Sequence, residues 1–173
     1  MEMRTNKAHL VTGGARSGKT ACALRLAEQS GLEKWMIATA ESGDAEMAER
    51  IAKHRAERGD GWRVVEEALD LAGALERELH RGRVIVVDCL TLWLSNLMYH
   101  ERNIEQELGR LCNMVERSHD PLIFVTNELG MGLVPESSLG RAFRDLHGRM
   151  NQQVAERCDA ATFVVSGMAM KIK

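Results

Sequence analysis

The sequence predicts an α/β fold in which helices cover both faces of a mainly parallel sheet. Short apolar runs of strand type alternate with longer segments of helical composition, and this alternation is typical of such a fold. Residues 83–88 form a β-branched run ending in Asp88, as expected of a central parallel strand buried on both faces. No repeat, linker or low-complexity tract interrupts the 173 residues, so we expect a single domain over 1–173.

The first half of the chain alternates strands and helices. Residues 8–12 are a short apolar run, and the segment after Lys19 is rich in helix formers with apolar positions at helical spacing. Gly31 fits the end of that helix, and Asp44 is a plausible N-cap for a second helix. Partial alternation favours an edge strand after Gly61. The expected elements are strand 8–12, helix 21–28, strand 34–40, helix 45–58, edge strand 62–67 and helix 70–80.

The second half repeats the alternation. Asn103 is placed to cap a helix. The last helix carries a core-like apolar stripe at helical spacing, made of Leu139, Phe143, Leu146, Met150 and Val154. The expected elements are strand 83–88, helix 92–100, helix 104–117, strand 121–128, helix 138–157 and a closing strand 161–167.

A phosphate-binding motif, G-x-x-x-x-G-K-[ST], lies between the first strand and the first helix. Glycines let backbone amides converge on phosphate oxygens, the lysine reaches the β- and γ-phosphates, and the final hydroxyl serves Mg²⁺. The strand–loop–helix context supports nucleotide binding over a chance glycine-rich turn. The motif residues are Gly13, Gly14, Ala15, Arg16, Ser17, Gly18, Lys19 and Thr20.

Asp88 ends the central strand, at the edge where open α/β sheets place ligands. An acid there holds Mg²⁺ beside the loop hydroxyl in phosphate-loop enzymes, so we expect Thr20 and Asp88 to form the magnesium site. The alternative is that Asp88 only caps the helix that follows.

Composition excludes several classes of function. A formal net charge of −2 gives no global attraction to nucleic acid or anionic membranes, so we expect a small substrate. Four scattered cysteines without a C-x-x-C pair argue against a zinc site or a disulfide framework and fit a reducing cytosol. No apolar run is long enough for a membrane span, and we see no export signal, so we expect a cytoplasmic protein.

The expected helix 45–58 has a basic edge. Arg50, His54 and Arg58 are spaced i, i+4, i+8 and share a face. Spacing alone favours a solvated helix face, and a phosphate-handling face is the other interpretation.

Together these segments resemble the bifunctional adenosylcobinamide kinase/adenosylcobinamide-phosphate guanylyltransferases of cobalamin biosynthesis. The resemblance spans nearly the whole chain and implies a P-loop NTPase-like (RecA-like) fold. The combination of the phosphate loop with Thr126-Asn127-Glu128-Leu129-Gly130-Met131-Gly132 is far more selective than the loop alone. The other matching segments are 38–40, 46–51 with His54 and Arg55, Trp62, the strand to Asp88, 143–145, 148–149, 151–152 and 165–171.

The resemblance implies two reactions on a corrinoid substrate: phosphorylation of adenosylcobinamide by ATP or GTP, then GMP transfer from GTP. It implies that His54 is the residue guanylylated, and that Lys19 also takes part in catalysis. Histidine suits the role because its pKa of about 6.5 leaves much neutral imidazole near pH 7. Beyond the phosphate loop and Asp88, the expected nucleotide-binding residues are Thr39, Ala40, Glu41, Arg55, Arg58 and Glu66, with Glu67 as an adjacent alternative to Glu66.

The resemblance also implies a homotrimer. The apolar loop 130–134 could be a subunit interface, a corrinoid contact or simple turn chemistry, and spacing does not separate these. Two other functions remain open: a P-loop kinase for another small metabolite, and a nucleotide switch. The switch is disfavoured because Asn127 is followed by Glu-Leu-Gly rather than the Asn-Lys-x-Asp guanine signature.

Overall fold

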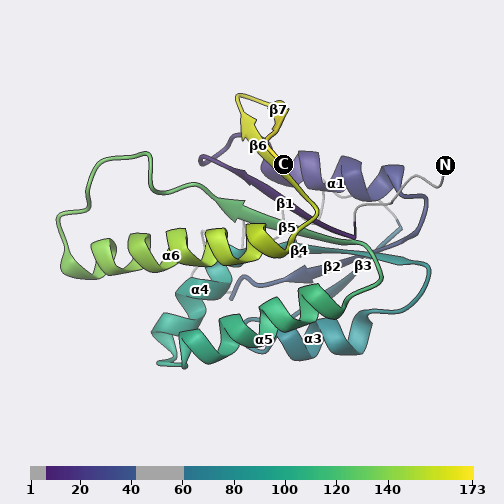
Figure 1. The fold of residues 1–173 in the computed structure, drawn as a ribbon, viewed down its shortest axis with the longest axis horizontal. Coiled ribbons are helices and arrows are strands. Elements are labelled where there is room, and N and C mark those ends of the chain that lie inside the picture. The colour runs from purple at the N-terminus through teal and green to yellow at the C-terminus, as the bar shows by residue number, and fades with distance from the viewer. Residues whose placement is uncertain (1–6, 42–60) are drawn as a thin grey trace.

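Figure 1 presents the fold in a computed structural model that describes residues 7–41 and 61–173. The expected helix 45–58 and its cap Asp44 lie outside the described residues. The strands are β1 (Ala8–Gly13), β2 (Glu33–Ala38), β3 (Trp62–Glu66), β4 (Arg83–Asp88), β5 (Leu122–Asn127), β6 (Ala160–Val165) and β7 (Met168–Lys171). The helices are α1 (Lys19–Gln29), α3 (Leu71–Glu78), α4 (Leu90–Tyr99), α5 (Ile104–Arg117) and α6 (Ser138–Arg157).

The strands form one seven-stranded sheet in the order β3-β2-β4-β5-β1-β6-β7. All neighbouring pairs are parallel except β6 and β7, so the prediction of a mainly parallel sheet is confirmed. The prediction of an edge strand at residues 62–67 is also confirmed, because β3 pairs only with β2 in the described sheet. The sequence analysis did not anticipate β7.

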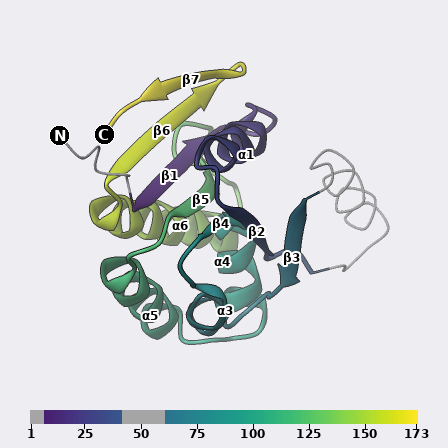
Figure 2. The same ribbon diagram turned by 90° about the vertical axis from the view of Figure 1, so that its right-hand side faces the viewer.

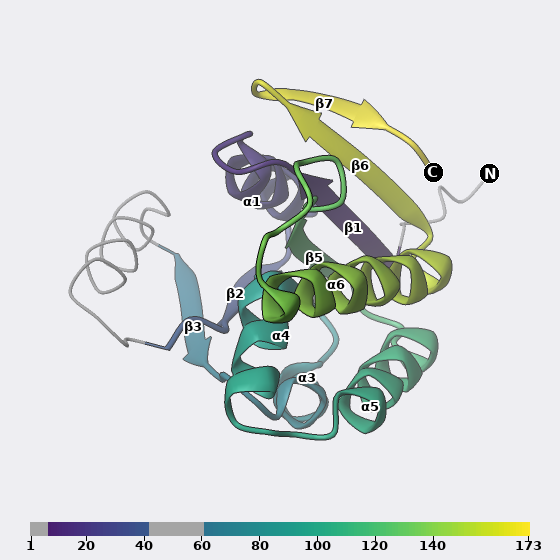
Figure 3. The ribbon, with the colours of Figure 1, turned by 90° about the vertical axis from the view of Figure 1, so that its left-hand side faces the viewer.

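Helices pack on both faces of the sheet, as Figures 2 and 3 show: α1 lies on one face and α3, α4, α5 and α6 on the other. The strand side chains alternate between the two cores. On β4, Val84 and Val86 join the core under α1, whereas Ile85 and Val87 join the core of the opposite helices. This two-residue alternation is what a strand buried on both faces produces.

The helix ends follow local signals in the sequence. Gly31 has a left-handed φ of 68° just after α1, as expected of a glycine that ends a helix. Asn103 caps α5 as predicted, because its side chain accepts the amide of Gln106 at 3.1 Å. Asp70 caps α3 in the same way by accepting the Gly73 amide.

The apolar stripe predicted on α6 is only partly correct. Met150 and Val154 are buried, Phe143 and Leu146 are partly buried, but Leu139 is 68% exposed. The first turns of α6 extend beyond the carboxyl edge of the sheet, so Leu139 has no sheet to pack against (Figure 1). The third buried residue of α6, besides Met150 and Val154, is His147, a polar residue outside the predicted stripe.

No helix within the described ranges is both long and apolar enough to cross a membrane.

Candidate active site

The loop between β1 and α1 lies at the carboxyl edge of the sheet. A Cβ at Gly13 would collide with the carbonyl oxygen of Val164 on β6, so only glycine fits there. Gly18 forms the left-handed N-cap of α1 (φ 98°), and its carbonyl accepts the Cys22 amide at 3.0 Å. The loop therefore leads directly into a helix N-terminus, where free amides and the helix dipole favour an anion. The strand–loop–helix context predicted for Gly13–Thr20 is confirmed.

The turn between β6 and β7 packs against this loop. The Gly167 amide donates to the Ser17 carbonyl at 2.8 Å. Ser166 and Gly167 both have positive φ, 50° and 79°, which is the geometry of a two-residue hairpin turn. The sequence analysis missed this contact, although a Ser-Gly pair between two strand-like segments is itself a hairpin signal.

Lys19 lies in the first turn of α1 and reaches back across the loop. Its side chain is largely buried, and Nζ donates to the Gly14 carbonyl at 2.6 Å. Burial lowers the pKa of the Lys19 ammonium, and the nearby Asp88 carboxylate opposes that shift. The ammonium is thus held beside the start of the loop, within reach of a phosphate placed there.

Thr20 and Asp88 converge beside Lys19, as predicted. The Thr20 hydroxyl donates to Asp88 Oδ2 at 3.1 Å, which joins the start of α1 to the end of β4. The N-cap position of α4 belongs to Cys89, whose side chain makes no capping bond, so the interpretation of Asp88 as that cap is not supported. A hydroxyl and a carboxylate are hard oxygen ligands that fit Mg²⁺, which usually completes its shell with substrate phosphates and water.

Thr39, which is expected to contact nucleotide, follows β2 and bonds to the turn after Asp88. Its side chain is fully buried. The hydroxyl donates to the Cys89 carbonyl at 2.7 Å and accepts the Cys89 amide at 2.9 Å. Asn96 Nδ2 in turn donates to the Thr39 carbonyl at 2.7 Å. In this structure, Thr39 therefore acts on the site through the turn that follows Asp88.

The thiol of Cys89 is unreactive, although Cys89 follows Asp88 directly in the sequence. Burial and the Asp88 charge raise the pKa of its thiol to about 12, so the thiol stays protonated near pH 7. All four cysteines are free, which agrees with the expectation of no disulfide framework.

The acids expected at the outer strands are spread along the carboxyl edge. Glu66 ends β3, and its Cα lies opposite Ala38, which itself lies opposite Asp88, so Glu66 is two strands away from Asp88. The adjacent Glu67 has a structural role, because its Oε1 accepts the amides of Leu69 and Asp70 at 3.0 and 2.9 Å. The two acids that the sequence could not separate thus have different surroundings.

The segment after β2 continues along the same edge. Ala40 is partly buried, and Glu41 is exposed and pairs with His100 Nε2 at 3.1 Å. The other predicted site residues, His54, Arg55 and Arg58, lie outside the described residues.

A buried polar network fixes the carboxyl end of β5, and the sequence analysis did not find it. Thr91 on α4 accepts the Asn127 amide at 2.9 Å and hydrogen-bonds His147 Nε2 at 2.9 Å. Thr126 donates to Asn151 Oδ1 at 2.7 Å, and Asn151 Nδ2 donates to the Asn127 carbonyl at 3.0 Å. Two helices therefore hold the last residues of β5 beside the phosphate loop.

We expect His147 to make the protein less stable at mildly acidic pH. Burial lowers its pKa, so the unfolded chain, with a pKa near 6.5, binds the proton more readily and acid favours unfolding. The free energy of unfolding should fall as pH drops below about 6.5, by no more than about 1.4 kcal/mol per pH unit from this group. In urea unfolding at pH 7.5 and 5.5, His147→Gln should lose less stability than wild type. Equal losses would contradict this, and His80→Gln, at an exposed position, is the control.

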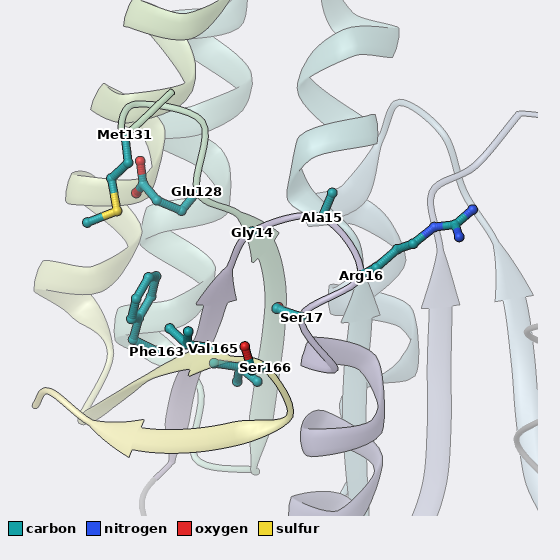
Figure 4. A pocket seen from close by; sticks show the side chains of 10 residues that line it. Gly14, Ala15, Arg16, Ser17, Glu128, Met131, Phe163, Val165 and Ser166 are labelled. Carbon is teal, nitrogen blue, oxygen red and sulfur yellow. The ribbon is translucent and has the colours of Figure 1, made fainter. Parts of the chain in front are cut away.

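A pocket of about 360 Å³ opens beside the phosphate loop. Figure 4 shows Glu128, Met131 and Phe163 together on one side of it, while the Arg16 side chain points away. Its walls come from the loop, the end of β6 and the segment after β5. The lining residues are Gly14, Ala15, Arg16, Ser17, Glu128, Met131, Phe163, Val164, Val165 and Ser166.

Solved structures share this fold at low sequence identity. An ATPase from the type III secretion system of pathogenic bacteria superimposes with a TM-score of 0.61 and 10% identity, covering 95% of this chain and 56% of that one. A Pyrococcus horikoshii OT3 protein gives a TM-score of 0.59 and 12% identity, covering 99% of this chain and 88% of the other. The predicted P-loop NTPase-like, RecA-like fold is therefore confirmed.

Sequence comparison is more specific. Residues 9–172 match the family described as cobinamide kinase / cobinamide phosphate guanyltransferase. The bifunctional adenosylcobalamin biosynthesis protein CobP of Pseudomonas aeruginosa is 46% identical over 95% of this chain and 96% of its own length. The bifunctional adenosylcobalamin biosynthesis protein CobU of Escherichia coli K12 is 38% identical over 95% of this chain and 98% of its own. Since the match runs through both the phosphate loop and the network at the end of β5, this chain belongs to the cobinamide kinase / cobinamide phosphate guanyltransferase family.

Proposed function

We propose that this protein phosphorylates the hydroxyl on the aminopropanol arm of adenosylcobinamide and then transfers GMP from GTP to the phosphorylated corrinoid. The product would be adenosyl-GDP-cobinamide. The observation that carries the proposal is the convergence of Lys19, Thr20 and Asp88 on one phosphate loop in a chain of this family.

In the kinase step, the protein acts mainly by positioning and electrostatics. The loop amides and the N-terminus of α1 hold the phosphates, and Lys19 Nζ, 2.6 Å from the Gly14 carbonyl, stabilises charge on the transferring phosphoryl group. Thr20 and Asp88 would hold Mg²⁺, which neutralises phosphate charge when bound. The donor in this step is ATP or GTP, and the phosphate loop does not select between them because it contacts phosphates and not the base.

Asp88→Asn tests the magnesium site. We expect the kinase rate to fall roughly 10³-fold at moderate Mg²⁺, because metal stabilisation of the transition state is worth several kcal/mol. A Mg²⁺ titration of initial rates should also show a higher half-saturating concentration. Asp145→Asn, on the exposed face of α6, is the control. A wild-type magnesium dependence in Asp88→Asn would remove Asp88 from this role.

In the transfer step, neutral His54 attacks the α-phosphorus of GTP. A nitrogen–phosphorus bond forms, the bond between the α-phosphorus and its bridging oxygen breaks, and pyrophosphate leaves. A phosphate oxygen of the phosphorylated corrinoid then attacks the same phosphorus and releases the histidine. Arg50, Arg55 and Arg58 are close to His54 in the sequence, and as cations they would disfavour the imidazolium form and hold phosphates.

The remaining nucleotide contacts are part of the proposal. We assign Gly13 to Thr20 to the phosphates, and Ala40, Glu41, Arg55, Arg58 and Glu66 to the nucleotide, with Thr39 supporting the site from below. We further propose a homotrimer that works in the cytoplasm.

Mass spectrometry of the corrinoid tests the function. The purified protein is incubated with adenosylcobinamide, Mg²⁺ and either ATP or GTP alone, or both. The expected result is a gain of one phosphoryl group with a suitable donor, followed by a gain of one GMP group only when GTP is present. A phosphorylated corrinoid that never gains GMP would mean that the protein has the kinase activity but not the guanylyltransferase activity. No change in the corrinoid with a nucleotide-binding protein would overturn the proposal.

A further inference from the structure

We propose that Glu128 is the general base of the kinase step, taking the proton from the corrinoid hydroxyl, and that the adjoining pocket holds the arm that carries this hydroxyl. The inference rests on the proposed kinase activity. It gives a role to the acid of the Thr126-Asn127-Glu128 segment, which has none in the transfer chemistry described above.

Backbone register places Glu128 at the start of the phosphate loop. Asn127 lies opposite Gly13 in the parallel pairing of β5 with β1. The next residue, Glu128, donates its amide to the Gly13 carbonyl at 2.9 Å. The buried network around Asn127 anchors this segment from below, so the position of Glu128 does not depend on a free loop.

The position of Lys19 shows that the transferred phosphate would bind at the start of the loop, near Gly13 and Gly14. Its ammonium lies 2.6 Å from the Gly14 carbonyl, and the lysine of this motif serves the β- and γ-phosphates. The Glu128 amide donates to the carbonyl of Gly13, the residue next to Gly14. Glu128 therefore lies beside the place where the γ-phosphate would bind. A general base must lie where the attacking hydroxyl approaches that phosphorus.

The pocket beside Glu128 suits an alcohol on an aliphatic arm. Figure 4 shows Met131 and Phe163 next to Glu128, and Val165 on the floor of the same hollow. These apolar side chains can pack against an alkyl chain, while the loop supplies the phosphate side. Glu128 is the one carboxylate among the described residues that line this pocket.

The carboxylate is oriented for the task. Glu128 Oε1 accepts the Gly130 amide at 2.6 Å, and Oε2 makes no hydrogen bond to any residue in 7–41 or 61–173. Oε2 can therefore accept a proton. As the alcohol oxygen bonds to the γ-phosphorus, the bond from that phosphorus to the β,γ-bridging oxygen breaks, the nucleoside diphosphate leaves, and the hydroxyl proton passes to Glu128.

The other acids at the carboxyl edge of the sheet are less well placed to act as the general base. Asp88 is bonded to Thr20 at the metal-binding side of the loop. Glu66 lies on β3, at the far edge of the sheet from β1, with β2, β4 and β5 between them. The titratable group that interacts with Glu128 is His147 from α6. Arg16 points away from the pocket, and the lining part of β6 carries no titratable side chain.

The test compares Glu128→Gln, Glu128→Asp and Glu136→Gln in the full chain. Glu136 is an exposed acid in the same segment and is the matched control. Single-turnover phosphorylation of adenosylcobinamide is measured with saturating ATP and Mg²⁺, from pH 5 to 9. ATP affinity and GMP adduct formation from GTP are measured in parallel, since a base for the corrinoid hydroxyl has no part in either.

We expect Glu128→Gln to slow phosphorylation about 10²-fold across this pH range, because the amide cannot take a proton. Glu128→Asp should recover part of the rate, and ATP affinity and the GMP adduct should stay within about twofold of wild type, as for Glu136→Gln.

Two results would overturn the inference while leaving the proposed function intact: a Glu128→Gln rate within about threefold of wild type, or a parallel loss of ATP binding and adduct formation, which indicates a structural role. A wild-type protein that does not phosphorylate adenosylcobinamide would instead refute the proposed kinase function and this inference with it.

Discussion

Replacing His54 with alanine is expected to abolish covalent guanylylation of the protein by GTP while leaving corrinoid phosphorylation in place. Only a nucleophile of suitable pKa can displace pyrophosphate from the α-phosphorus, and alanine has none. Intact-mass spectrometry after incubation with GTP and Mg²⁺ should show one added GMP in wild type and none in His54→Ala. This loss should be complete.

The other histidines provide the control. The five besides His54 are all described: His9 bonds Thr162, His100 pairs with Glu41, His119 contacts Lys7, His147 lies in the buried network, and His80 is exposed. His80→Ala should therefore form the adduct like wild type. An adduct that persists in His54→Ala, or that never forms in a wild-type protein that binds GTP, would refute the covalent mechanism.

Replacing Lys19 with methionine is expected to slow the kinase step by roughly 10³- to 10⁵-fold. This is the range measured for cations that stabilise a transferring phosphoryl group in other enzymes. Methionine keeps most of the apolar stem that packs in this largely buried position, so the change removes the charge and the 2.6 Å bond to Gly14 but little volume. Single-turnover rates at saturating ATP and Mg²⁺ measure the effect.

Two variants separate charge from geometry. Lys19→Arg keeps the charge but presents a wider planar group in a confined place, so it should recover only a small part of the rate. Lys7→Met removes an exposed cation outside the site and should behave like wild type. A Lys19→Met enzyme within tenfold of the wild-type rate would show that the loop amides and the metal suffice without this ammonium.

The sequence allowed much of the fold to be predicted because the strong signals are local. The β-branched run at 83–88 became the buried strand β4, and the phosphate loop with Asp88 formed the expected cluster. Asn103 capped α5 because an asparagine side chain can satisfy a free helix amide without help from the rest of the fold.

The features that were missed depend on distant parts of the chain. His147 is buried because Thr91 and Thr126, on other elements, give its ring polar partners, and no periodicity on α6 can report that. The sequence shows Thr39 only as a residue at the end of a strand, whereas its hydroxyl makes two hydrogen bonds to the backbone of Cys89. Leu139 was misassigned because helical spacing does not indicate where the sheet underneath ends.

The position of β1 also sets the order of events during synthesis. Its two neighbours are β5 and β6, and Ala8 pairs with Leu122, which the ribosome adds about 110 residues later. At about 5 to 20 residues per second, this delay is roughly 6 to 23 s. During that time the apolar strand that bears the phosphate loop has no partner in the sheet. β1 is thus enclosed in the sheet only after β5 and β6 have been made, and a nascent chain can bind nucleotide only late in translation.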